Sequence, residues 1–209
     1  MDSTSTNPVT LYTQYAVQLD QFSELLVRSN KKVNLVSSSE LGNLKAHVLD
    51  SLLLAPYLET EDSVLDLGSG GGFPVVPLAI ASPSVSFTAI DSSERKVDFL
   101  SYISSKLRLR NLTAIHGRIE EQSSLHQTFT CVTARALAPL PELIPLAFPF
   151  LKTAPSSRLL FLKGENYESE VLSSTDVANE LGLSSSKPSV YTDIPGRSMS
   201  AILRYTSSR

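Results

Sequence analysis

The chain reads Val64-Leu65-Asp66-Leu67-Gly68-Ser69-Gly70-Gly71-Gly72-Phe73-Pro74 at the point that decides its fold. The apolar start predicts a buried strand, and four glycines then permit positive φ angles and a close approach of backbone to ligand. Pro74 suits the first position of a helix, where its missing N–H has no intrahelical partner to lose. The stretch therefore predicts a strand, a tight turn and a helix that together cradle a nucleotide.

The spacing of the glycines indicates which kind of nucleotide fits. A dinucleotide fingerprint counted from Gly68 requires a small residue at position 73, where this chain has Phe73. With no glycine there to admit a pyrophosphate, a smaller ligand such as S-adenosylmethionine (SAM) fits better.

Strand and helix patterns alternate downstream of the turn. The predicted strands are residues 85–90, 112–116, 128–133 and 158–162, and the predicted helices are 73–81, 92–111, 139–151 and about 168–181. Two closely spaced strands, 189–192 and 199–205, predict a terminal antiparallel pair. The expected fold is α/β, Rossmann-like, with a seven-stranded, mostly parallel sheet, a terminal antiparallel strand and helices on both faces.

Apolar stripes at helical spacing over residues 11–27 and 41–58 predict a helical cap upstream of the sheet. Residues 1–60 are therefore interpreted as an N-terminal helical extension packed on one globular unit, residues 61–209. A chain of 209 residues with 42% hydrophobic residues can bury one substantial core and hardly two. The serine runs 37–39 and 184–186 are typical of loops.

Composition excludes several classes of protein. No apolar run reaches the roughly 18 residues that span a bilayer, and Met1-Asp2-Ser3-Thr4-Ser5-Thr6 is too polar for a signal peptide, so we expect a cytoplasmic protein. The single cysteine, Cys131, excludes an internal disulfide and suits a buried strand position. The three histidines lack the spacing of metal ligands, and no metal site is expected.

An acidic residue follows the second predicted strand at the edge of the sheet where ligands bind. Asp91 lies 23 positions after Gly68, near the ~20 expected for an acid that holds ribose hydroxyls. The alternative is an aspartate that caps the next helix. The paired glycine turn favours the ribose role.

Basic residues follow the other strands at the same edge. With a net charge of −3, the chain has no basic field over its whole surface, so nucleic-acid binding would need a local patch. Such a patch suggests a phosphate-rich substrate, and the alternative is salt bridges with neighbouring acids, Glu120, Glu121 or Asp91. The cations expected to converge are Arg95, Arg118, Arg135 and Lys163.

Several segments together resemble the RsmG (GidB) family of bacterial 16S ribosomal RNA guanine-N7 methyltransferases. Besides the glycine turn and Asp91-Ser92, the resemblance rests on Gly117-Arg118-Ile119-Glu120-Glu121, Ala134-Arg135-Ala136-Leu137-Ala138-Pro139-Leu140 and Leu162-Lys163-Gly164. Upstream, Asn34-Leu35 and His47-Val48-Leu49-Asp50-Ser51-Leu52 match the N-terminal signature of the family. The resemblance covers residues 31–204. It departs from the family pattern at Ser29, where a tryptophan is common, and at Ala46, where a basic residue is common.

The resemblance implies a class I SAM-dependent fold and a role for each matching residue. Gly68 and Phe73 would line the methionine and adenosine side of the turn, Asp91 and Ser92 would bind the ribose, and Ile119 and Glu120 would flank the adenine. Arg135 would lie by the cofactor and the incoming base. The RNA-facing cations would be Arg95, Arg118, Lys163 and Arg197. His47 and Asp50 could equally form a helix-packing pair.

The implied reaction needs no acid or base from the chain, because guanine N7 carries a lone pair and no proton. The implied partner is 16S ribosomal RNA within the 30S subunit or an assembly intermediate, and a monomer is expected. Three other interpretations stay open: a SAM-dependent methyltransferase acting on another RNA, a protein or a small molecule; a nicotinamide-dependent oxidoreductase; and a non-catalytic SAM- or RNA-binding module.

Overall fold

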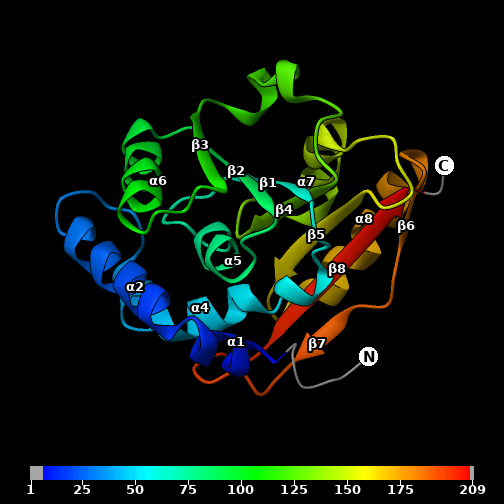
Figure 1. Ribbon diagram of the computed structural model, residues 1–209. Coiled ribbons are helices and arrows are strands. Elements are labelled where there is room, and N and C mark those ends of the chain that lie inside the picture. Colours follow the sequence, from blue (N-terminus) through cyan, green and yellow to red (C-terminus); the bar gives the residue numbers. More distant parts are fainter. Residues whose placement is uncertain (1–6, 208–209) are drawn as a thin grey trace.

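A computed structural model describes residues 7–207 and shows one twisted sheet with helices on both faces (Figure 1). The strand order is β3-β2-β1-β4-β5-β8-β6, with β7 also paired to β8. Strands β1 to β5 are parallel, and β8 runs antiparallel to β5. The strands are β1 (Ser63–Leu67), β2 (Ser86–Asp91), β3 (Leu112–His116), β4 (Cys131–Arg135), β5 (Arg158–Lys163), β6 (Leu183–Ser185), β7 (Ser189–Tyr191) and β8 (Ser200–Ser207).

The mostly parallel α/β sheet is confirmed, but the described chain has eight strands where seven were predicted. The additional strand is β6, whose serines were wrongly predicted to form a loop. Strands β6 and β7 pair with opposite ends of β8, Leu183 with Ser207 and Tyr191 with Ser200. Pro188 lies between them and has no N–H to donate to a ladder. Two short strands, β6 and β7, therefore together occupy the edge position next to β8.

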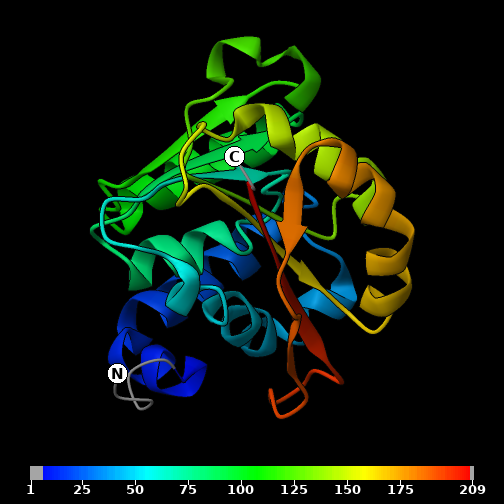
Figure 2. The same cartoon turned by 90° about the vertical axis from the view of Figure 1, so that its right-hand side faces the viewer.

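Alternate strand residues face two separate hydrophobic clusters, as the period of two in a strand requires. One face is covered by α5 (Val75–Ala81) and α6 (Glu94–Lys106), and the other by α7 (Leu140–Ala147) and α8 (Tyr167–Glu180). Figure 2 shows α7 and α8 on the opposite side of the sheet from the blue N-terminal helices. Helix α5 begins at Val75, two residues later than predicted, and Pro74 is its N-cap and not its first residue.

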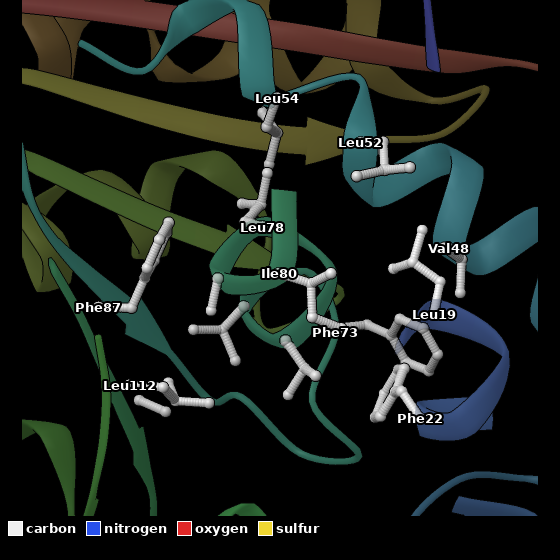
Figure 3. Packing of buried hydrophobic residues seen from close by; sticks show 14 of the residues in the cluster. Leu19, Phe22, Val48, Leu52, Leu54, Phe73, Leu78, Ile80, Phe87 and Leu112 are labelled. Carbon is white, nitrogen blue, oxygen red and sulfur yellow. The ribbon is translucent and has the colours of Figure 1, made fainter. Parts of the chain in front are cut away.

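The N-terminal helices share the first of these clusters with the sheet. They are α1 (Pro8–Gln14), α2 (Ala16–Asn30), α3 (Ser38–Leu41) and α4 (Leu44–Leu52). Leu19 and Phe22 of α2 and Val48 of α4 pack toward Phe73 at the glycine turn (Figure 3). The Phe22 ring meets the Phe73 ring edge-on, with centroids 5.3 Å apart. The helical cap is therefore continuous with the core beneath the turn.

Two local features of the cap and core bear on the sequence predictions. The serine run at Ser37 is no plain loop, because Ser37 and Glu40 form a capping box that starts α3. Cys131 is fully buried in β4, where burial raises the pKa of its thiol to about 12.

Over residues 7–207 no helix is long and apolar enough to cross a membrane. The interpretation of Met1-Asp2-Ser3-Thr4-Ser5-Thr6 as not being a signal peptide lies outside the described residues.

Candidate active site

The glycine turn joins β1 to α5 with its backbone in the left-handed region. Gly68 has φ +66°, Gly70 +53° and Gly72 +96°, angles that side chains rarely allow. A Cβ placed on Gly68 would lie 2.7 Å from Cδ1 of Leu137, so a side chain here would require the Leu137 side chain to move, in addition to the strain of the positive φ. The turn consequently presents bare backbone to the space above the sheet.

Asp91 ends β2 and fastens the turn to the next helix. Its Oδ2 accepts a hydrogen bond from Gly70 N (2.9 Å), and its Oδ1 accepts one from Ser93 N (2.9 Å) at the start of α6. The side chain is nearly buried, at 7% exposed. Because each carboxylate oxygen has two lone pairs, both can accept a further hydrogen bond. The helix-start role is therefore present in the structure, and it leaves Asp91 able to bind two hydroxyls.

A cavity of about 570 Å³ opens above the carboxyl ends of β1, β2 and β3. This volume lies in the usual range of small-ligand sites. Five residues predicted to bind the cofactor line it: Gly68, Asp91, Ser92, Ile119 and Glu120. Carboxylates for hydroxyl and amine donors and a bare glycine backbone fit an adenosine-containing ligand such as SAM.

The remaining predicted cofactor residues, Phe73 and Arg135, line a neighbouring hollow of about 200 Å³. We call this space the acceptor hollow, after the role that we propose for it. It shares Gly68, Lys96 and Ala136 with the larger cavity, so the two spaces meet at the glycine turn. The Arg135 guanidinium carbon lies 4.9 Å from the centroid of the Phe73 ring, within the range of a cation–π interaction. Phe73 stands where a dinucleotide-binding turn needs a small residue. In the structure its ring packs against the guanidinium of Arg135.

Asp50 of α4 connects two arginines from distant parts of the chain. Its Oδ2 lies 3.1 Å from Nη2 of Arg197 and 3.8 Å from Nη1 of Arg135, and its Oδ1 accepts a hydrogen bond from the Ser200 hydroxyl. Asp50 is fully buried, and burial raises the pKa of its carboxyl against the lowering effects of Ser200 and the two guanidiniums. Asp50 is thus a buried counter-charge for Arg135 and Arg197.

His47 and Glu40 complete the surroundings of Arg135. Arg135 Nη1 donates to His47 Nδ1 (3.0 Å), since a guanidinium can only donate. Burial and the nearby charges of Arg135 and Arg197 lower the pKa of His47 to about 4, so its imidazole is neutral at pH 7. Glu40 lies 3.8 Å from Nη2 of Arg135. Burial raises the pKa of Glu40, but hydrogen bonds from Ser37 and the charge of Arg135 leave it below its usual value. His47 and Asp50 therefore both contact Arg135. From the sequence alone, their role was left open between a site contact and a helix-packing pair.

The predicted cations lie in different environments. Arg118 is exposed at the large cavity. Lys163 is nearly buried, donates to Ala138 O (2.6 Å) and pairs with Glu170 (2.7 Å), so for this residue a salt bridge is what the structure shows. Arg135, Lys163 and Arg197 line one hollow of about 330 Å³. Arg95 is exposed but lines neither this hollow nor the cavity; it borders a groove between α2 and α6. The expectation of one common rim is therefore wrong for Arg95.

Two residues that line the site, and one buried acid directly before the glycine turn, were missed from the sequence. Lys96 lines both the large cavity and the acceptor hollow, while Ala136 lines both and has φ +52°, an unusual strain for a non-glycine residue. Asp66 is fully buried in β1 directly before the turn. Its Oδ1 accepts from Thr133 (2.8 Å), and within the described residues its Oδ2 has no hydrogen-bond partner. An acid inside an apolar strand was the available signal for Asp66.

The sheet order, the glycine turn and the acid after β2 define a class I SAM-dependent methyltransferase fold. Solved structures with this fold include an O-methyltransferase from Bacillus cereus in complex with SAH, with TM-score 0.63 and 13% identity over 91% of each chain. A SAM-dependent methyltransferase from Aquifex aeolicus gives TM-score 0.60 and 17% identity over 85% of this chain and 98% of that one. The predicted fold class is confirmed.

The family follows from sequence comparison. The family model of GidB, rRNA small subunit methyltransferase G, matches residues 16–191. The protein named ribosomal RNA small subunit methyltransferase G from Lactococcus lactis is 39% identical over 161 residues, covering 74% of this chain and 67% of its own. The one from Leuconostoc mesenteroides is 32% identical over 200 residues, covering 92% and 83%. The chain belongs to the GidB (RsmG) family, which confirms the resemblance found in its sequence.

Proposed function

We propose that this protein transfers a methyl group from SAM to N7 of a guanine in 16S ribosomal RNA. The observation that carries the proposal is the junction of two spaces at Gly68, Lys96 and Ala136. The larger cavity has the chemistry of an adenosine site, and the acceptor hollow has Arg135, which the buried Phe73 ring supports and beside which a purine could bind. Membership of the GidB family supports ribosomal RNA as the substrate class.

The cavity residues divide between the parts of SAM. Asp91 and Ser92 would bind the ribose hydroxyls, and Ile119 and Glu120 would flank the adenine, with Gly68 leaving room for the chain that carries the sulfur. Bound SAM supplies an electrophilic methyl group on a sulfonium. The glycine turn, which Asp91 ties through Gly70 N, would hold that end of SAM beside the acceptor hollow.

The chain's part in the reaction is positional and electrostatic. Guanine N7 needs no deprotonation, and the neutral His47 already uses Nδ1 to accept from Arg135. Holding the purine at attack distance can contribute up to about 7–11 kcal/mol. Transfer leaves the purine positively charged, which the arginines alone would oppose. Asp50 and Glu40 offset Arg135 and Arg197, so the hollow tolerates the new charge.

The setting of the reaction is part of the same proposal. We place the protein in the cytoplasm as a monomer acting on 16S RNA in the 30S subunit or an assembly intermediate. Residues 1–60 and 61–209 would act as one unit, because cap residues contact Arg135 of the sheet. Arg118, which is exposed at the cavity, would contact RNA phosphates together with Arg95 and Arg197. Lys163 would hold the loop after β4 in place, because it donates to Ala138 O and pairs with Glu170.

The test is methyl transfer from labelled SAM to three substrates: naked 16S RNA, 30S particles and total protein. Digestion and mass mapping should find the label as 7-methylguanosine at one position of 16S RNA. Label on an adenine, on another RNA or on protein would refute the assignment and support another methyltransferase. SAM binding without turnover on any substrate would support a non-catalytic module.

A further inference from the structure

A second groove lies between α2 and α6, outside the cavity and the acceptor hollow. It has a volume of about 510 Å³, and we call it the α2–α6 groove. Phe99 and Leu35 form a buried apolar floor, while the Tyr102 side chain stands at the edge with 41% of the residue exposed. An exposed aromatic ring beside an apolar floor offers a face for a planar group.

Four cations lie along this groove or beside its ring. Arg28, Lys32 and Arg95 line the groove, and Lys106 Nζ lies 5.6 Å from the centroid of the Tyr102 ring. Arg28 is partly offset by Glu24, at 3.7 Å, and Asp98 also lines the groove. Within residues 7–207, Lys32 and Arg95 form no ion pair, and both are exposed. A protein of net charge −3 therefore has a local basic patch around an aromatic ring.

The groove adjoins the acceptor hollow. Leu35 lines both spaces, and of the neighbours at the start of α6, Arg95 faces the groove while Lys96 faces the hollow. A strand that places one base in the acceptor hollow could thus continue past Leu35 into the groove. Stacking faces combined with cations are what single-stranded nucleic acid requires.

We propose that the α2–α6 groove binds a nucleotide of unpaired RNA next to the target guanine. The base stacks on Tyr102, and Lys32 and Arg95 hold the flanking phosphates. This inference rests on the proposed function and identifies the part of the surface that holds the RNA beyond the reacting base. It also assigns an RNA-binding role to Arg95, which does not line the cofactor cavity.

The test measures binding of a fluorescently labelled, single-stranded oligoribonucleotide to the full chain by anisotropy. Tyr102→Ala should weaken RNA binding about tenfold, within the range of stacking on one aromatic ring, while Tyr102→Phe keeps most of the affinity. Lys32→Ala and Arg95→Ala should each weaken binding and reduce the dependence of log Kd on log salt by roughly 0.7. Lys152→Ala, an exposed lysine near the opposite end of β5, is the control and should change neither.

A Tyr102→Ala variant that folds, binds SAM normally and keeps the wild-type RNA affinity would overturn the inference. So would a loss of activity on 30S particles with unchanged binding of naked RNA, because the groove would then hold a protein. The proposed function fails separately: it is refuted if the wild type methylates no guanine, whatever the groove variants do in the binding assay.

Discussion

Replacing Asp66 with Asn should change how the stability of this protein depends on pH. Asp66 is fully buried, and its Oδ2 has no hydrogen-bond partner within the described residues. Burial raises the pKa of its carboxyl from the usual 3.8 to about 7, although Ser69, Thr133 and Arg135 act in the opposite direction. In the folded protein the carboxyl therefore stays protonated at pH values where the unfolded chain has already ionised it.

The size and sign of the effect follow from that difference. Each pKa unit corresponds to about 1.4 kcal/mol, so a rise from 3.8 to about 7 corresponds to roughly 4 kcal/mol. Because the folded pKa is the higher one, the stability associated with this group is fully present below the unfolded pKa. It is lost as the pH rises from about 4 to about 7. Asn cannot ionise, so Asp66→Asn removes this loss.

The assay is urea unfolding of the wild type and Asp66→Asn at several pH values between about 4 and 8. Near pH 4 the variant should be the less stable, by about 1–3 kcal/mol, because its amide lacks an acceptor. The difference should then move in favour of the variant by about 4 kcal/mol up to pH 8. Asp176→Asn, an exposed acid on α8, is the control. A constant difference between wild type and Asp66→Asn would refute the reasoning, because Asp66 would then be ionised in the native state.

Three further predictions concern the site. Gly68→Ala should lower SAM affinity more than tenfold by calorimetry, because φ is +66° and the new Cβ would meet Leu137; unchanged affinity would contradict the cradle. Arg118→Ala should raise the KM for RNA in methylation assays and leave the Kd for SAM nearly intact, whereas a large loss of SAM binding would reject its RNA role. Asp50→Asn should cost about 3 kcal/mol or more in thermal unfolding, because two arginines lose a buried counter-charge; a stable Asp50→Asn would show that Arg135 and Arg197 are solvated.

The parts of the structure that the sequence predicts are those set by local pattern. Short apolar runs that alternate with helical patterns place β1 to β5, and the glycines before Phe73 place the turn. Strand β6 escaped because three residues are too short to show an alternation, and only Leu183 among them is buried. Ser37 is a different case, because Ser37 and Glu40 have the spacing of a capping box, a signal that the sequence already contains.

The polar partners of Arg135 could not be predicted, because they come from two helices of the cap, α3 and α4, far from Arg135 in the sequence. Glu40, Asp50 and His47 belong to the cap and lie far from Arg135 in sequence, and Arg197, which shares Asp50, lies before β8. The sequence shows which cations follow the strands and so lie at the ligand-binding edge of the sheet. It does not show which acidic side chains contact each cation. The orientation at the start of α6 is a similar case. Successive helix residues point about 100° apart, so Arg95 and Lys96 serve different spaces.

The two spaces of the site differ in whether the cap lines them. The larger cavity is lined by residues 68–146, all of them downstream of the cap. The acceptor hollow instead takes Leu35, Val36 and Glu40 from the cap. Asn43, also in the cap, donates to Gly196 O (2.5 Å), next to the arginine that pairs with Asp50. We therefore expect changes in the cap to alter RNA methylation before they alter SAM binding.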